Sequence, residues 1–383
     1  MNRVLFVSNG HGEVAIAARL AAEVQARGPI PCDHLALVGD FRYPSTMREV
    51  GPRQAMPSGG VIAMGNFRNI ARDVRAGLVM HTLAQLRFLR GVRRTYSVAV
   101  AVGDVYALIM ALQAQARATV FVGTAKSVYV APYGRIEERV IAKADATFVR
   151  DAQTAQVLAD HGIGATPANT IVDLYADPPD ALDVPFDPLL ALFPGSREPA
   201  YDDAVFLASV MRDLCRSRTG AGGVLSIAPG IDPQRMCAKL ENDGWRIEPT
   251  PGALEPFALY DGEREVVRAW QGSLGAMLRR ATLVLGQAGT ANEAAAAQGI
   301  PIVAFARTGE VRAPWYRMRQ IGLLGEAMIV APAQAQQAVR DVLALLDDPQ
   351  RRERMGATGR ERMGPRGSAP LIAARIDALV NGK

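Results

Sequence analysis

The stretch VLFVSNGHGEVAIAARLAAEV, residues 4–24, runs from an apolar segment through a polar loop into an alanine-rich helical pattern. The loop contains Gly10, His11, Gly12 and Glu13. Gly-x-Gly-x-x-Ala spacing between a strand and a helix is typical of nucleotide-binding α/β domains, because glycine lets the backbone approach a phosphate. A tight turn without a ligand remains the alternative interpretation of the same spacing.

The same succession of apolar runs and helical patterns repeats along the chain. The runs are apolar on both faces, as in parallel sheets covered by helices. The expected strands are Val4–Val7, His34–Val38, Val98–Val102, Ala118–Val122, Ala146–Val149, Leu189–Phe193, Val224–Ile227, Ala281–Leu285, Pro301–Phe305 and Ala327–Val330. The pattern predicts two doubly wound, Rossmann-like α/β domains facing a cleft, with ligands beyond the carboxyl ends of the strands.

A segment rich in proline and aspartate, ADPPDALDVPFDP at 176–188, lacks a helical period and is the best linker candidate. A chain of 383 residues is also long for a single core. We therefore expect an N-terminal domain over 1–175, a linker over 176–187 and a C-terminal domain over 188–383. Packing of the terminal helix back onto the N-terminal domain is left open.

The composition is that of a globular protein, with 49% hydrophobic and 21% charged residues and a formal charge of +5. Three scattered cysteines without metal-ligand spacing suit a reducing compartment. The longest apolar stretch, 98–112, is interrupted by Gly103 and Asp104, which argues against a membrane-spanning helix. We expect a cytoplasmic protein.

Two loops in the second half carry groups suited to phosphate binding. In LALFPGSREPAYDDAV, 190–205, Gly195 and Ser196 follow an expected strand, and Arg197 adds a charged fork for an anion. In LVLGQAGTANEAAAAQGIPIVAF, 283–305, small residues precede a helix whose first turn contains Glu293. This carboxylate could accept hydrogen bonds from a ribose, or it could simply cap an alanine-rich packing helix.

Together these loops resemble the nucleotide-sugar half of a GT-B glycosyltransferase. With SNGHGE at 8–13, AVGDVYAL at 101–108 and FVGTAKS at 121–127, the chain is most similar to the lipid-A-disaccharide synthase-related family. The resemblance implies that the C-terminal domain holds a UDP-sugar and the N-terminal domain takes the acceptor. It implies that Gly195, Ser196, Arg197, Gly289 and Thr290 lie near the diphosphate and that Glu293, with Asn292 beside it, contacts the ribose. The positions of the other loops add Gly10, Gly12, Glu13, Lys126 and Gln287 as candidates for substrate binding.

Two residues of the first half are candidates for the catalytic base. An inverting sugar transfer needs a base that takes the proton of the acceptor hydroxyl. The resemblance favours Asp104, which follows the strand expected at 98–102, while His11 emerges from the first loop and has an ordinary pKa near 6.5. We expect Asp104 to be the base and His11 to orient it or the acceptor, with the roles reversed as the alternative. A helix cap at Asp104 and an ordinary turn at His11 are the structural alternatives.

The lysine of VGTAKS, 122–127, does not belong to a P-loop. That motif needs a glycine directly before the lysine, where Ala125 stands, and another five residues earlier, where Val120 stands. ATP hydrolysis is therefore not expected. Lys126 either faces the cleft or is a solvated loop lysine.

The segment 66–96 carries seven arginines and one acidic residue, Asp73. In a helix these arginines share one broad side with Val79 and Leu83, whereas Val74 falls on the opposite side, toward the core. Arginines mixed with leucines suit the anionic inner face of the cell membrane, and a solvated basic face is the alternative. Nucleic acid is disfavoured because aromatic residues are almost absent from the stretch.

Together with the resemblance, these observations predict an inverting transfer of a sugar from a UDP-sugar, such as UDP-GlcNAc, to a lipid or glycolipid acceptor, by a peripheral membrane protein. No Asp-x-Asp stands at a strand end, so no metal and no other cofactor is expected, and helix N-termini with Arg197 would stabilise the departing UDP. Three alternatives remain: a UDP-GlcNAc 2-epimerase-like enzyme, a nicotinamide-dependent oxidoreductase with Asp40 as ribose partner, and a non-catalytic scaffold that binds nucleotide sugars.

Overall fold

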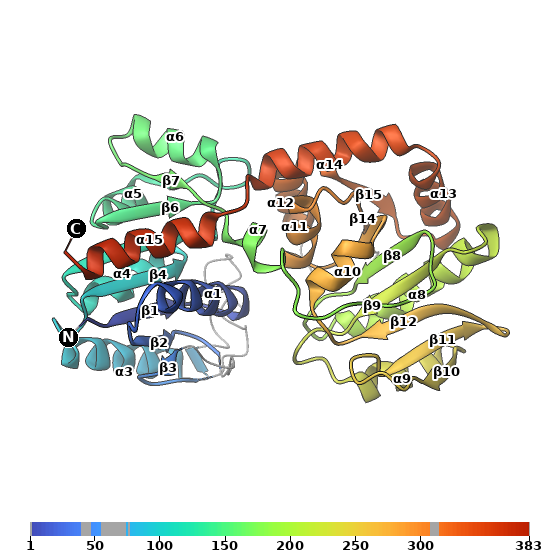
Figure 1. Ribbon diagram of the computed structural model, residues 1–383, viewed down its shortest axis with the longest axis horizontal. Helices are drawn as coiled ribbons and strands as arrows, with labels where there is room; N and C mark the ends of the chain where they lie inside the picture. The colour runs from blue at the N-terminus through green and yellow to red at the C-terminus, as the bar shows by residue number, and fades with distance from the viewer. Residues whose placement is uncertain (1, 40–46, 55–73, 76, 307–313, 383) are drawn as a thin grey trace. The chain divides into compact units, whose positions relative to one another are not determined.

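The computed structural model describes residues 2–39, 47–54, 74–75, 77–306 and 314–382 (Figure 1). The chain divides into two compact units. Unit 1 comprises Met1–Leu174 and Arg366–Lys383, and unit 2 comprises Tyr175–Pro365. The segment 176–187, expected to be a linker, belongs to unit 2, while the terminal helix α15 (Ser368–Val380) belongs to unit 1.

Unit 1 contains a seven-stranded parallel sheet in the order β3-β2-β1-β4-β5-β6-β7. Its central strands are buried on both faces, as the apolar runs predicted. The strands are β1 (Val4–Ser8), β2 (Cys32–Ala36), β3 (Arg48–Glu49), β4 (Val98–Gly103), β5 (Ala118–Gly123), β6 (Ala146–Val149) and β7 (Thr166–Pro167).

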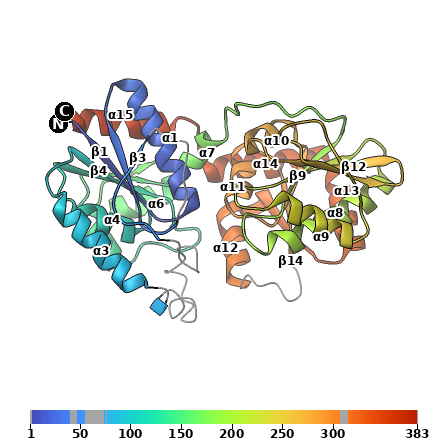
Figure 2. The same cartoon turned by 90° about the horizontal axis from the view of Figure 1, so that it is seen from below.

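Helices cover both faces of this sheet. α1 packs against α7 and α15 (Figure 2), and α4 packs against α3 and α5. Asp173 anchors the start of α15, because its carboxylate accepts hydrogen bonds from the backbone N–H groups of Gly367 and Ala369, both at 2.7 Å. The helices are α1 (His11–Arg27), α3 (Leu78–Gly91), α4 (Val105–Gln113), α5 (Arg135–Ile141), α6 (Ala152–Asp160) and α7 (Thr170–Leu174), with α15.

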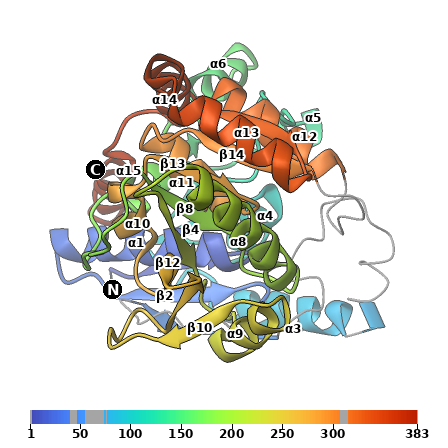
Figure 3. The same ribbon diagram turned by 90° about the vertical axis from the view of Figure 1, so that its right-hand side faces the viewer.

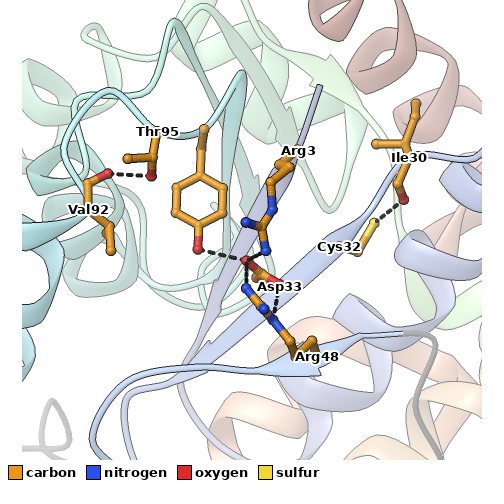
Figure 4. Close-up of polar contacts among 8 residues, drawn as sticks. Arg3, Ile30, Cys32, Asp33, Arg48, Val92 and Thr95 are labelled. Carbon is orange, nitrogen blue, oxygen red and sulfur yellow. Dashed lines mark hydrogen bonds and ion pairs between the residues drawn. The ribbon is translucent and has the colours of Figure 1, made fainter. Parts of the chain in front are cut away.

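The amino edge of the sheet is held by a buried carboxylate. Asp33 on β2 accepts hydrogen bonds from Arg3, at 2.7 Å, and from Arg48, at 3.0 Å (Figure 4). The hydroxyl of Tyr96 donates to the same carboxylate at 2.8 Å. Three donors compensate the cost of burying this charge, so the cluster ties together four segments at the edge opposite the carboxyl ends of the strands.

Unit 2 contains an eight-stranded mixed sheet in the order β10-β11-β12-β9-β8-β13-β14-β15. β10, β11 and β12 form an antiparallel meander, and the remaining pairs are parallel. The strands are β8 (Leu189–Phe193), β9 (Gly222–Ser226), β10 (Arg246–Pro249), β11 (Phe257–Asp261), β12 (Arg264–Trp270), β13 (Leu283–Gly286), β14 (Ile302–Ala306) and β15 (Met328–Pro332).

Seven α-helices surround the described part of the second sheet. α14 packs against α11, α12 and α13, whereas α9 lies beside β10 at the other edge of the sheet (Figure 3). The helices are α8 (Ala200–Ser217), α9 (Pro233–Asn242), α10 (Leu274–Arg280), α11 (Thr290–Ala297), α12 (Pro314–Leu324), α13 (Ala335–Leu346) and α14 (Pro349–Met363). Both units are thus doubly wound α/β folds, as predicted.

Candidate functional site

Each sheet has one position where the strand order reverses direction. In unit 1 this switch point lies between β1 and β4, and in unit 2 it lies between β8 and β13. Ligands of open α/β sheets bind beyond the carboxyl ends of the strands at such points. The loops that were predicted to carry the site residues begin at these points. Gly10 follows β1, Asp104 follows β4, Gly195 follows β8 and Gln287 follows β13.

The loop after β8 turns through Gly195, whose φ of 118° favours glycine. Ser196 and Arg197 are exposed. Arg197 accepts a hydrogen bond from Ala200 through its backbone carbonyl, at 2.8 Å. Its guanidinium makes no hydrogen bond or ion pair with the residues that the structure describes. The loop after β8 thus presents a cation at the edge of the sheet just before α8 begins.

The loop after β13 is built around a fully buried amide. A Cβ added to Gly286 would lie 2.0 Å from Oδ1 of Asn292, so only glycine leaves space for this side chain. Nδ2 of Asn292 donates to the carbonyl of Gly286 at 3.3 Å, which closes the loop on itself. Oδ1 is buried and has no hydrogen-bond partner among the residues that the structure describes. Asn292 therefore shapes the loop from behind.

The helix that follows this loop is held rigidly from its far side. The amides of Asn292 and Glu293 both donate to the carbonyl of Gly289, which forms the first turn of α11. Thr290 and Glu293 are half-buried at this helix N-terminus, a position suited to an anion. The alanines of α11 pack on α14, where a Cβ at Gly359 would lie only 2.5 Å from the carbonyl of Ala296.

Gln287 was predicted to bind the substrate, but its side chain is bonded inside the protein. It is fully buried, and its amide bonds the backbone of Phe305 on the neighbouring strand in both directions, at 3.1 Å. Its Oε1 also accepts from the buried guanidinium of Arg317 at 2.8 Å. Gln320, next to Arg317 on α12, donates to the carbonyl of Ala288 at 2.8 Å. Gln287 thus braces the loop together with two residues that no sequence motif marked.

In unit 1, Asp104 is the N-cap of α4. Its Oδ1 accepts from the backbone N–H of Ala107 at 3.0 Å, and its Oδ2 accepts from Asn9 at 3.5 Å. The cap was the structural alternative for this residue, and the geometry bears it out. Because the bond to Asn9 is long and Asp104 is only half-buried, Oδ2 keeps capacity to accept from a ligand.

The glycines of the first loop surround a protein side chain. Gly10, with a φ of 108°, directly precedes α1, which begins at His11 and contains Gly12 and Glu13 in its first turn. A Cβ on Gly10 would lie 2.9 Å from Oε2 of Glu13, and one on Gly103 would lie 3.2 Å from its Cγ. The small residues therefore make room for the Glu13 carboxylate. The side chain of His11 lies outside the described parts of the structure.

Lys126 forms an ion pair with Glu137 of α5, with Nζ and Oε2 2.6 Å apart. Its Nζ also lies 5.9 Å from the centre of the Tyr133 ring. The lysine is thus directed at neighbouring elements of unit 1.

α3 presents a mixed apolar and basic surface. Val79, Met80 and Leu83 are 54%, 71% and 53% exposed. Arg75 before the helix, Arg87 and Arg90 within it, and Arg93 and Arg94 after it are also exposed. Residues 55–73, which include Arg68 and Arg72, lie outside the described residues, as does Asp40.

The core side of α3 differs from the prediction. Val74, expected to face the core, is 47% exposed, and the buried positions belong to His81, Gln85 and Leu89. Gln85 donates to the carbonyl of Leu37 at 2.9 Å, beyond the carboxyl end of β2, and a ring nitrogen of His81 bonds the same carbonyl at 3.1 Å. Polar residues can occupy this side because their side chains hydrogen-bond the backbone carbonyls of Ala36 and Leu37 at the end of β2.

The described residues contain neither a candidate membrane-spanning helix nor a candidate metal cluster. None of the helices they form is long and apolar enough to cross a membrane. Among the same residues no three His, Cys, Asp or Glu side chains come together as a metal site would require.

Comparison with known proteins identifies the fold. No family profile matches the chain, and no curated protein matches its sequence. MurG of Acinetobacter baumannii matches with a TM-score of 0.56 and 12% identity, over 98% of this chain and 99% of its own. CalG4, the calicheamicin glycosyltransferase, matches with a TM-score of 0.60 and 17% identity, over 100% and 99%. UDP-GlcNAc 2-epimerase of Neisseria meningitidis, solved with UDP-GlcNAc, matches with a TM-score of 0.52 and 11% identity, over 98% and 99%. The chain has the GT-B fold.

Proposed function

We propose that the protein transfers a sugar from a UDP-sugar to a lipid or glycolipid acceptor, with inversion at the anomeric carbon and without a metal. The observation that carries the proposal is the pair of glycine loops, after β8 and β13, that meet at the switch point of unit 2. Solved proteins of the same fold include glycosyltransferases and an enzyme with bound UDP-GlcNAc. Membership of the lipid-A-disaccharide synthase-related family is part of the proposal.

The donor would bind through its nucleotide. Arg197 supplies a charge-assisted fork for the diphosphate, and the N-terminus of α11 with Thr290 supplies backbone and hydroxyl donors. Glu293 lies one turn into α11 and would accept from the ribose hydroxyls. As the bond from the anomeric carbon to the UDP oxygen breaks, the negative charge that grows on the diphosphate is stabilised by the same groups.

The acceptor would be activated in unit 1. Oδ2 of Asp104 takes the proton of the acceptor hydroxyl, whose oxygen then attacks the anomeric carbon from the face opposite UDP. The bond that Asp104 makes to Ala107 through Oδ1 fixes the orientation of the carboxylate. His11 begins α1 at the same edge of the sheet and is the proposed orienting group.

The acceptor's lipid would reach the protein at the inner face of the cell membrane. The exposed Val79, Met80 and Leu83 would enter the interface, while the arginines after them would bind anionic headgroups. His81 and Gln85 fix this helix to the end of β2, next to β1 in the sheet. Docking by α3 would therefore hold the edge of unit 1 near its lipid substrate.

A second candidate is a UDP-GlcNAc 2-epimerase-like reaction, which the structural likeness to such an enzyme favours. The two reactions leave different products. A transferase needs an acceptor and releases UDP as it makes a glycolipid, whereas an epimerase converts UDP-GlcNAc without one.

Titration with UDP and with NAD, followed by incubation of a UDP-sugar panel with membrane lipid extract, tests the proposal. The expected result is UDP binding, no NAD binding, and a new glycolipid resolved by mass. Conversion of UDP-GlcNAc in the absence of lipid would instead support the epimerase. Binding of UDP without any product would identify a scaffold.

A further inference from the structure

The loops after β4, β5 and β6 form one continuous edge in unit 1. Gly103 pairs with Gly123 across β4 and β5, and Gly123 pairs with Val149 across β5 and β6. The backbone N–H of Thr124 donates to the carbonyl of Gly103 at 2.9 Å. The guanidinium of Arg150 donates to the carbonyl of Thr124 at 3.1 Å. Asp104, Thr124 and Arg150 therefore follow three neighbouring strands at the same edge of the sheet, and Asp151 comes directly after Arg150.

A tyrosine from outside the sheet reaches into this edge. Tyr133 is 8% exposed, and its ring packs edge-on against Phe121 with centroids 6.4 Å apart. Its hydroxyl lies 2.5 Å from the position that a Cβ on Gly123 would take, so this glycine admits the phenol to the edge. The hydroxyl is buried and has no hydrogen-bond partner in the described portion of the chain.

Three further oxygen atoms at this edge are also buried without a hydrogen-bond partner among the described residues. These atoms are Thr124 Oγ1, Asp151 Oδ2 and Asn9 Oδ1. They come from the loops that follow β5, β6 and β1. Because buried polar atoms are nearly always bonded to protein, water or ligand, four such atoms at one ligand-binding edge point to an absent polar occupant.

The hydrogen-bonding capacity of these atoms indicates which class of ligand could bind among them. The oxygens of Asp151 and Asn9 only accept hydrogen bonds, so the occupant must donate. Burial, together with the charges of Glu137, Asp151 and Asp104, raises the pKa of Tyr133, which therefore stays protonated and donates in turn. Of the cations nearby, Lys126 is paired with Glu137, whereas Arg150 donates to the neutral carbonyl of Thr124 and partly offsets the effect of the carboxylates on Tyr133. A phosphate would be repelled by the carboxylates of Asp104 and Asp151, which outnumber Arg150, whereas a hydroxylated group would donate hydrogen bonds to them.

We propose that Tyr133, Thr124 and Asp151 form a subsite for a neutral, hydroxylated group of the acceptor, such as a sugar residue of a glycolipid. This rests on the proposed function, because it assigns the acceptor of that reaction to a chemical class. The subsite lies on the edge that also holds Asp104, so a sugar bound there would present a hydroxyl near the proposed base.

The test compares two amphiphiles that differ in headgroup. Octyl β-glucoside and octyl phosphate are titrated below their micelle-forming concentrations into the wild-type protein and Tyr133→Phe, by calorimetry. The wild type should bind the glucoside, and Tyr133→Phe should weaken that binding about three- to tenfold, the size of one hydrogen bond, without changing octyl phosphate binding. Thr124→Val should act in the same direction.

Tyr96→Phe is the matched control. It removes the hydroxyl bonded to Asp33 at the opposite edge, so it should lower stability and leave glucoside binding unchanged. Tyr133→Phe should not lower stability, because it removes a buried hydroxyl without a partner among the described residues. Equal glucoside binding by Tyr133→Phe and wild type, or no glucoside binding by the wild type, overturns the subsite. A separate titration with UDP shows whether the proposed UDP-sugar site fails, independently of the subsite.

Discussion

Oδ1 of Asn292 lies 2.0 Å from the position that a Cβ on Gly286 would take. Any residue larger than glycine at position 286 would therefore clash with Asn292. The two residues flank the loop that would receive the diphosphate, Gly286 as the last residue of β13 and Asn292 in the first turn of α11. Gly286→Ala should force the loop away from Asn292, lower the free energy of unfolding by about 1–3 kcal/mol and weaken UDP binding. Chemical denaturation and calorimetric titration with UDP measure the two effects.

Two variants make this prediction specific. Gly164→Ala is the control, since no atom lies within 4 Å of the Cβ it would add. Adding Asn292→Ala to Gly286→Ala should recover part of the lost stability by removing the clash. If the double variant is less stable than the sum of the single changes predicts, the clash is not the cause.

Charge at the donor loop can be tested directly. Arg197→Ala should weaken UDP binding roughly 10- to 100-fold, because a hydrogen bond to a charged group contributes about 1.5–3 kcal/mol. Glu293→Ala should also weaken it, by removing a ribose acceptor. The control is Arg216→Ala, which removes an exposed arginine paired with Asp261 at the far end of α8. Unchanged UDP affinity in both folded variants would refute the donor site.

The parallel strands could be predicted from the sequence because burial on both faces leaves runs of apolar residues. The antiparallel meander β10–β12 was missed, since Arg264, Glu265 and Arg268 interrupt the apolar pattern of β12 with charges. Arg268 is compensated by Glu265 of the same strand and by Glu255, which precedes β11. The contact with Glu255 joins separate segments, and no local pattern reveals it.

The candidate site was predictable to the level of the loops. Glycines mark the turns after β1, β8 and β13, and all three follow the strands at the switch points. The roles of single residues were not predictable, because these roles depend on neighbours that are distant in the sequence. Gln287 faces Phe305 and Arg317 instead of a ligand, and Gly103 makes room for Glu13.

Membrane binding should depend on the arginines at the end of α3. Replacing Arg87, Arg90 and Arg94 together by glutamine should reduce sedimentation with vesicles that contain anionic lipid, and high salt should reproduce the effect in the wild type. The control replaces Arg340, Arg351 and Arg354 of unit 2, which changes the net charge equally. If the control loses as much binding, the effect is one of net charge and α3 is not the docking surface.

His34 should make stability depend on pH. Burial, with a contribution from the charge of Arg53, lowers the pKa of His34 to about 4, and a ring nitrogen bonds Ser8 at 2.8 Å. The unfolded chain binds a proton near pH 6.5 and the folded chain does not, so stability should fall as pH drops from about 6.5 to about 4. The loss approaches about 3 kcal/mol and then levels off.

The comparison variant is His34→Gln, which keeps a polar group beside Ser8 but cannot titrate. Unfolding free energies measured by urea at several pH values should converge with those of the wild type at low pH. Curves of identical slope across this window would mean that His34 titrates equally in both states.

The last prediction concerns the base. Asp104→Asn should lower kcat at least about a hundredfold, the usual size of general-base catalysis, while the affinity for UDP stays within a few-fold. Folding should be preserved, because asparagine also accepts the hydrogen bond from Ala107 as an N-cap. Asp348→Asn, which alters the N-cap of α14 in the same way, should leave turnover unchanged. His11→Ala should cost less than Asp104→Asn. The opposite order would make His11 the base, and full turnover in both variants would remove this edge of unit 1 from the chemistry.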